Sequence, residues 1–218
     1  RLPKRRDTAR LWAYLLLHAG EPQQRDSIAE TLWPEAAQAR FNLRHNLHAL
    51  KAFLPEADAD QPWLLVDNDT LAWNPQAPAR TDLQVFSTGL TPRSNSGRDT
   101  SDLEGALGAY SGELLAGWDD AWIADPRERL ARQFRGALER LIVLSRESGA
   151  RDRALAFAER LLAAEPYVEA SHRLLIACLL DVGDQEGARA RAAALRTMLR
   201  EEFASTPEAD TLQLLKAL

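Results

Sequence analysis

The chain of 218 residues is 45% apolar and 27% charged, a composition that supports a sizeable core and excludes intrinsic disorder over most of the sequence. Its apolar runs reach at most seven residues, far short of the roughly 18 that a membrane span requires, so we expect no transmembrane segment. A single cysteine and the lack of a visible secretory signal are typical of a cytoplasmic protein.

The net charge of −5 argues against a uniformly basic nucleic-acid-binding protein, but the charge is unevenly distributed. Residues 1–54 contain nine Lys or Arg against five Asp or Glu, residues 55–80 one against five, and residues 81–218 17 against 22. The basic excess of the first quarter suits contact with phosphates, and the mildly acidic remainder suits a protein partner.

The first 80 residues have the pattern of three helices followed by a β-hairpin. Apolar spacing and turn formers predict helices over Thr8–His18, Arg25–Leu32 and Glu35–Phe53. Two strand-like runs, Trp63–Val66 and Leu71–Trp73, flank a polar turn. This order of elements is that of a winged helix-turn-helix, a DNA-binding fold.

The third of these helices presents a basic face. Leucines at helical spacing, from Leu43 to Leu54, predict its buried side, and the residues opposite them form an exposed face without any carboxylate. Arg and Lys suit guanine edges or phosphates, and Gln and Asn suit adenine. The candidate DNA-binding residues on this helix are Gln38, Arg40, Asn42, Arg44, His45, His48 and Lys51, and the exposed face also includes Phe41. A helix face that is basic but only solvated, with no DNA-binding role, would show the same pattern.

Two flanking features modify this hypothesis. Arg25 begins the second predicted helix and the run Lys4–Arg6 precedes the first, so both are candidates for phosphate contacts. The tip of the hairpin is acidic, with Asp67 and Asp69 where a wing that enters the minor groove is expected to carry Arg or Lys. We therefore expect the wing to pack or to contact a partner rather than to read DNA.

The segment Thr91–Ser101 is predicted to be a linker, because it lacks apolar residues and is rich in turn formers. We divide the chain into a winged helix-turn-helix domain, residues 1–80, and a helical domain, residues 81–218. The helices predicted in the second domain are Asp102–Tyr110, Asp125–Ser148, Asp152–Ala164, Val168–Val182, Gln185–Phe203 and Asp210–Leu218.

This helical half contains an internal repeat. Four residues recur 34 positions later, and 34 is the period of tetratricopeptide repeats. The matched pairs are Leu141 and Leu175, Gly149 and Gly183, Ala154 and Ala188, and Ala158 and Ala192. We therefore expect a mainly α protein in which a winged helix is followed by a tetratricopeptide-like (TPR-like) repeat domain, with an ordinary helical bundle as the alternative.

No pattern of catalytic residues, phosphate-binding loop or metal site is recognisable, so we expect neither an enzyme nor a cofactor or metal. His45 and His48 alone are too few ligands for a stable metal site. Cys178 lies on an apolar helix stripe and is interpreted as a buried hydrophobic residue. Trp118 and Trp122 are expected to hold the connection between helices against the helical half.

Several segments together resemble known families. The first 51 residues resemble the winged-helix domain of antibiotic-regulatory (SARP-type) activators. The second half resembles the bacterial transcriptional activator domain of the same proteins. The resemblance is carried by Leu11–Gly20, Arg25–Pro34 and Ala39–Lys51, and by Ala109–Gly117, Trp122, Arg127–Arg129, Leu161–Pro166, Ala170–Arg173 and Glu202–Leu212.

The resemblance implies a transcription regulator, an activator that binds promoter repeats. By position, the residues on the family's recognition helix are Arg40, Asn42, Arg44, His45, His48 and Lys51. The helical domain is implied to support a second protomer on double-stranded DNA and to contact RNA polymerase. Family members usually begin with a small sheet, which we expect to be absent because this chain starts close to its first helix.

A second interpretation is a protein-interaction adaptor or scaffold, part of a larger signalling protein, that does not bind DNA. The winged helix would then be a protein-docking surface, which its acidic hairpin would permit. The positive charge of the long helix favours DNA binding over this protein-docking role.

Overall fold

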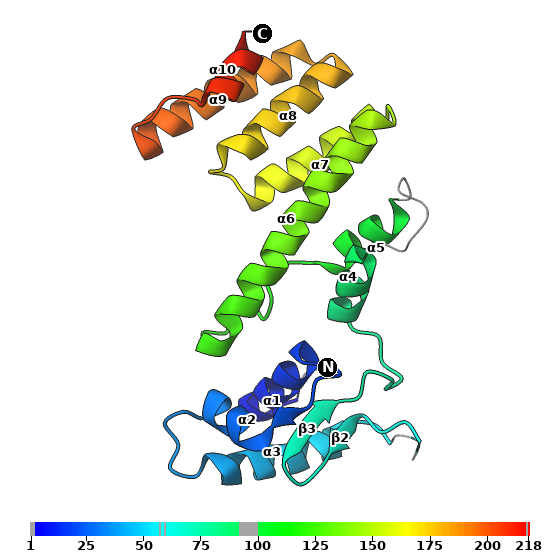
Figure 1. The fold of residues 1–218 in the computed structure, drawn as a ribbon. Helices are drawn as coiled ribbons and strands as arrows, with labels where there is room; N and C mark the ends of the chain where they lie inside the picture. Colours follow the sequence, from blue (N-terminus) through cyan, green and yellow to red (C-terminus); the bar gives the residue numbers. More distant parts are fainter. Residues whose placement is uncertain (1–2, 57, 59, 92–99, 217) are drawn as a thin grey trace. The chain divides into compact units, whose positions relative to one another are not determined.

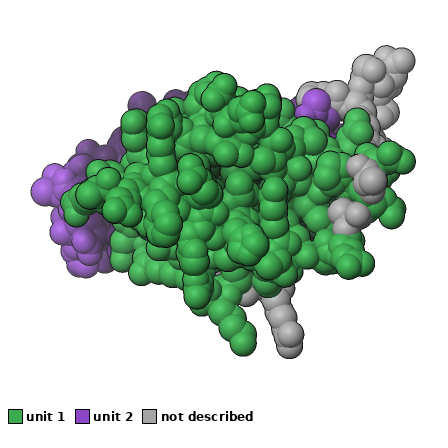
Figure 2. Space-filling model, turned by 90° about the horizontal axis from the view of Figure 1, so that it is seen from below, with its two compact units in different colours: residues 1–83, 114–127 green, residues 84–113, 128–218 purple. Residues whose placement is uncertain are grey.

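The computed structural model describes residues 3–56, 58, 60–91, 100–216 and 218 (Figure 1). The chain is mainly helical and forms two compact units, which are coloured separately in Figure 2. The first unit consists of residues 1–83 and 114–127, and the second of residues 84–113 and 128–218. No helix among the described residues is long and apolar enough to cross a membrane.

The first unit contains the predicted winged helix. Its elements are α1 (Arg6–Leu17), β1 (Gln23–Gln24), α2 (Arg25–Leu32), α3 (Ala39–Phe53), β2 (Leu64–Val66) and β3 (Thr70–Trp73). The predicted order of three helices and a hairpin is confirmed. The third helix begins later than predicted, because the residues after Trp33 form a turn in which the amide of Ala36 donates to the Trp33 carbonyl, 3.1 Å away.

The core of this unit lies between the three helices and the sheet. The three helices and β3 contribute large apolar side chains that are fully buried, and Trp73 of β3 is among them. Trp12, Trp33 and Trp63 also pack in or against this core. The fully buried aliphatic residues include Leu11, Leu15, Ile28, Leu32, Leu50 and Leu71.

The sheet is antiparallel, with the strand order β1-β3-β2. Leu64 pairs with Trp73 in the hairpin, and Gln23 of β1 pairs with Leu71 on the other edge of β3. The sequence does not predict β1, because two glutamines have no alternation of apolar and polar residues. Its pairing fixes the chain just before α2, whose first amide, on Arg25, donates to the Asp69 carbonyl at 2.9 Å.

Residues 114–127 form a strap that belongs to the first unit although they are far from it in sequence. The strap includes a short 3-10 helix, Ala121–Ile123. Its Trp122 packs against the winged-helix core and contacts Tyr14 of α1 edge to face, with ring centroids 5.6 Å apart. The prediction that Trp122 holds the connection against the helical half is wrong, because proximity in sequence to those helices does not determine which core receives the ring.

An ion pair also joins the strap to α1. A carboxylate oxygen of Asp120 lies 2.5 Å from a guanidinium nitrogen of Arg10, and the side chains are only 8% and 17% exposed. The Arg127 guanidinium holds the beginning of the strap by donating to the carbonyls of Leu114, Leu115 and Trp118 at 2.6–2.8 Å. The strap therefore buttresses the helix on which α3 packs.

The remaining helices build the second unit, with the first residues of α4 and α6 assigned to the first unit. They are α4 (Asp82–Leu90), α5 (Ser101–Ala109), α6 (Ala124–Glu147), α7 (Arg151–Ala164), α8 (Glu169–Val182), α9 (Gln185–Phe203) and α10 (Ala209–Leu215). Of the predicted linker, residues 92–99 lie outside the described residues, and Ser101 already belongs to α5.

The internal repeat is a structural repeat. α6 and α8 both end at a glycine in the left-handed region, Gly149 with φ 77° and Gly183 with φ 85°. The same capping bond recurs 34 residues later: the amide of Ala150 donates to the Ser145 carbonyl, and that of Asp184 donates to the Leu179 carbonyl. The four predicted alanines are also equivalent, since each is at most 3% exposed. Figure 1 shows α6 to α9 stacked in chain order, as expected for a TPR-like domain.

The sequence does not predict α4. Gly89, near the end of this helix, explains both the low helical propensity of the segment and its close packing on α5. Glycine is a poor helix former, so it lowers the helical propensity of this short segment. A Cβ at residue 89 would lie 2.5 Å from the carbonyl oxygen of Asp102 and 2.9 Å from the Cβ of Ala106. The absence of a side chain therefore allows α4 to pack directly on α5.

We predict that Gly89→Ala lowers the free energy of unfolding of the second unit by about 1–3 kcal/mol, because the backbone of α5 must move. The control is Gly105→Ala in α5, where a new Cβ meets nothing within 4 Å. Gly105→Ala should raise the free energy of unfolding of the second unit by about 0.5–1 kcal/mol, because alanine has a higher helix propensity than glycine. Urea unfolding followed by circular dichroism measures both, and equal effects of the two variants would contradict the close packing at Gly89.

We predict that Asp120→Asn destabilises the first unit by about 1–3 kcal/mol, because it leaves the partly buried Arg10 charge without its nearest partner. Asp119→Asn, at an exposed neighbouring position, should change stability by less than about 0.5 kcal/mol. All six tryptophans lie in the first unit, so urea unfolding followed by tryptophan fluorescence reports on that unit. An unchanged midpoint for Asp120→Asn would show that the strap does not support α1.

Candidate nucleic-acid interface

The candidate interface is the exposed face of α3, and the buried face of this helix determines its orientation. Leu43, Leu47 and Leu50 are buried in the winged-helix core as predicted. Leu54 was predicted to extend this stripe, but it follows the helix as its C-cap and is half-buried. Asn46 is buried on the same side, a position that the apolar pattern did not assign to the core.

Asn46 joins α3 to α1 through a buried hydrogen bond. The Thr8 hydroxyl donates to the Asn46 side-chain oxygen at 2.8 Å, and both residues are at most 5% exposed. The side-chain amide of Asn46 donates in turn to the Asn42 carbonyl at 2.9 Å. Since an unpaired buried amide is costly, these bonds favour one rotation of α3 about its axis.

That rotation exposes most of the predicted site residues. Arg40, Arg44 and Lys51 line one flank of the outward face, since residues four and eleven apart share a side of a helix. His45 lies on the other flank. The exposed predicted residues are Gln38, Arg40, Arg44, His45, His48 and Lys51, whereas Asn42 and Arg25 are half-buried. Gln38 is the N-cap of α3 rather than a residue within it.

Arg40 is paired with an acid that the sequence did not indicate. Its guanidinium lies 2.5 Å from a carboxylate oxygen of Asp26 in α2, and both side chains are more than half exposed. The hydrogen bond and the charge of Asp26 raise the pKa of Arg40. α3 itself is free of acids, but an acid from α2 therefore lies beside the first turn of α3.

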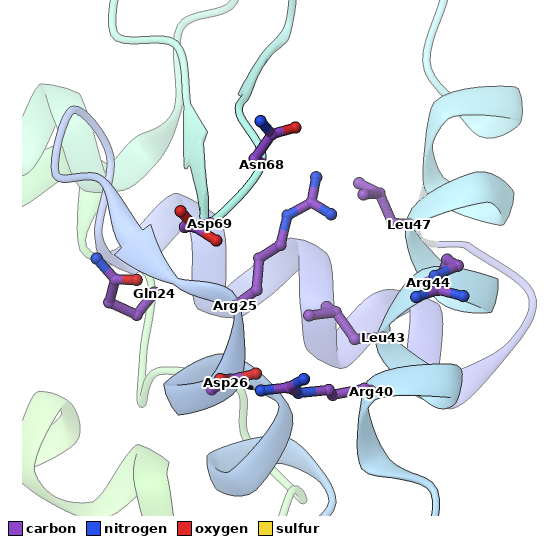
Figure 3. Close-up of a pocket in the computed structure, with 9 residues that line it drawn as sticks. All are labelled: Gln24, Arg25, Asp26, Arg40, Leu43, Arg44, Leu47, Asn68 and Asp69. Carbon is purple, nitrogen blue, oxygen red and sulfur yellow. Dashed lines mark hydrogen bonds and ion pairs between the residues drawn. The ribbon is translucent and has the colours of Figure 1, made fainter.

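Arg25, Arg40 and Arg44 line one pocket together, with a volume of about 220 Å³. Figure 3 shows the Arg25 side chain extending between Asn68 of the hairpin and Leu47 of α3. Its Nε atom is buried and has no hydrogen-bond partner among the described residues. The residues that line the pocket are Gln24, Arg25, Asp26, Arg40, Leu43, Arg44, Leu47, Asn68 and Asp69.

The hairpin tip contributes acids, not cations, to the exposed surface around this pocket. Asp67, Asn68 and Asp69 are all exposed, and their backbone forms a tight turn in which the Asp67 amide donates to the Thr70 carbonyl at 3.1 Å. Leu65 and Val66, just before the tip, are 46% and 40% exposed. The expectation that this wing contacts a partner rather than DNA remains a prediction.

On the other flank of α3, the predicted basic segment before α1 reaches the helix. A guanidinium nitrogen of Arg5 lies 2.6 Å from Nε2 of His45. The His45 ring is nearly parallel to the ring of Phe41, one turn earlier, with centroids 6.4 Å apart and an interplanar angle of 14°. Sequence patterns within α3 could not reveal the Arg5 contact, because its partners are 40 residues apart.

The arrangement has the properties of a surface for a polyanion. Its cations are exposed along a helix that carries no acid, and a long helix is the element that fits the DNA major groove. Among the described residues, no group of three or more His, Cys, Asp or Glu side chains could hold a metal ion. Cys178 is fully buried in the second unit as predicted, and burial raises the pKa of its thiol to about 11.

Residues 82–218 match the family described as the bacterial transcriptional activator domain, and this match covers more than half of the chain. The chain belongs to that family. The activator-domain segment begins at α4 and includes the repeat of α6 to α9. The resemblance found in the sequence of the second half is thereby confirmed.

The fold of this activator-domain protein is also similar to a solved structure. That structure is EmbR from Mycobacterium tuberculosis in complex with a low affinity phosphopeptide. The TM-score is 0.74 at 18% sequence identity, and the similarity covers 96% of this chain and 58% of that chain. The chain thus spans little more than half the length of EmbR. A comparison with curated proteins gave no match.

Proposed function

We propose that this chain is the DNA-binding and activating part of a bacterial transcription regulator that acts in the cytoplasm. In this proposal residues 1–80 bind promoter DNA, and residues 81–218 contact RNA polymerase and a second protomer. The observation that carries the proposal is the exposed, acid-free basic face of α3, on a winged helix within a chain of the activator-domain family.

In the proposed complex α3 lies in the major groove. Arg40 and Arg44 are the candidates for guanine edges, and Gln38 and Asn42 for adenine edges or the backbone. His45, His48 and Lys51 would contact phosphates along the helix. Arg25, at the beginning of α2, would contact a phosphate near the hairpin, where the positive end of the helix dipole also favours an anion.

A protein-docking role for the winged helix is the second candidate. It is favoured by the hairpin, where exposed Leu65 and Val66 adjoin an acidic tip that phosphate would repel. The two candidates differ in a simple observation: retention on heparin that is lost when His45, His48 and Lys51 are changed together supports DNA binding. Full retention by that triple variant favours the docking role.

We predict that Arg44→Ala and Lys51→Ala both weaken binding to duplex DNA, in different ways. If Arg44 reads a base, its loss should cost about 1–3 kcal/mol and relax specificity at one position. Loss of a phosphate contact at Lys51 should weaken binding evenly across sequences and reduce the salt dependence. Gel-shift titrations on sites selected from a random duplex library, at several salt concentrations, measure both effects.

The matched control for these variants is Arg200→Ala, at a highly exposed arginine of α9 whose partner is its neighbour Glu201. This change should leave DNA affinity within error of the unmodified protein. Unchanged affinity in both the Arg44 and Lys51 variants would exclude α3 as the groove-binding element.

We predict that two protomers bind adjacent half-sites cooperatively, because one helix contacts too few base pairs to specify a promoter. Inserting five base pairs between the half-sites turns one protomer to the opposite face of the duplex and should abolish cooperativity. Inserting ten base pairs, about one helical turn, returns both protomers to the same face of the duplex and tests whether their contact can span the added length. Cooperativity that survives the insertion of five would mean that the protomers do not touch.

A further inference from the structure

Phe41 is an exposed aromatic residue in the middle of a basic helix face. It is the third residue of α3, and 59% of its side chain is accessible to solvent. This exposure is the largest among the large apolar side chains described in the first unit. The residues around it on the outward face are cations and histidines, such as Arg44 and His48, and not apolar groups.

The neighbouring polar side chains of the first turn are less exposed or already paired. Arg40 pairs with Asp26, and Asn42 is half-buried. Phe41 has a lateral neighbour, since the His45 ring lies nearly parallel to it at 6.4 Å. The hydrogen bond from Arg5 holds the His45 ring on this flank. The outward side of the Phe41 ring remains open to solvent.

The charge around Phe41 decides which partner fits it. An apolar protein surface would have to desolvate the neighbouring cations without compensating them, whereas DNA pairs the same cations with phosphates. The major groove offers one apolar group on its base edges, the C5-methyl of thymine, and phenylalanine is among the side chains that contact it. The N-terminal residues of a recognition helix are those that reach base edges.

We propose that Phe41 determines specificity by contacting the C5-methyl group of a thymine in the major groove. This inference rests on the proposed function, because it requires α3 to lie in that groove. The Phe41 contact would add a preference for thymine, which the cations of α3 cannot provide because Arg and Lys contact guanine or phosphate. The preferred DNA site should contain thymine at one position opposite the first turn of α3.

The test replaces thymine by deoxyuridine, which removes only the methyl group. Duplex sites are first selected from a random library with the unmodified protein, and each thymine is then replaced singly. We expect about a four-fold loss of affinity at one position, the effect of losing one buried methyl group. With Phe41→Ala the thymine and deoxyuridine duplexes should bind equally, and Phe41→Leu should retain part of the difference.

Lys51→Ala is the control, because it should weaken binding to both duplexes while keeping the four-fold ratio between them. Circular dichroism of the Phe41 variants checks that the fold is retained, as expected for a side chain this exposed. Specific binding with no loss at any deoxyuridine position, or a loss that persists in Phe41→Ala, overturns the role of Phe41 alone. Failure of the unmodified protein to select any DNA sequence overturns the proposed function and this inference together.

Discussion

The exposed face of α3 depends on the burial of its opposite face. Leu43, Leu47 and Leu50 must enter the core, and the Thr8–Asn46 hydrogen bond allows one rotation of the helix without an unpaired amide. The exposed cations contribute little to stability, since solvent screens them. Buried contacts therefore determine the position of α3. Its outward residues can be substituted with little effect on stability.

Periodic signals made much of this fold predictable. The leucine spacing of α3 and the positions of Gly149 and Gly183 each express a local rule: one face of a helix is buried, and a helix ends where the backbone turns left-handed. β1 and α4 carry no such signal. β1 exists because its backbone pairs with β3, and α4 contains Gly89 because of its close approach to α5, so both depend on distant segments.

The same distinction applies to the candidate site and to the strap. The exposed face of α3 follows from helical periodicity, but the partners of its residues do not. Asp26 lies on α2 and Arg5 before α1, and the sequence alone gave no reason to pair them with Arg40 and His45. Trp122 packs against the winged helix and not against its sequence neighbours for a related reason: burial is decided by the nearest available core in space.

These pairings change how the surface would meet a polyanion. In the free protein Arg40 is compensated by Asp26, and His45 accepts a hydrogen bond from Arg5, so the cations of α3 do not all act as free charges. A phosphate that approaches Arg40 also approaches the Asp26 carboxylate, which partly cancels the attraction. Among the described residues, no carboxylate forms an ion pair with Arg44 or Lys51, so in the proposed complex these two cations would contribute most to non-specific attraction. In the proposed complex, selectivity would come from contacts with base edges, those of the arginines with guanine and that of the exposed Phe41 with thymine.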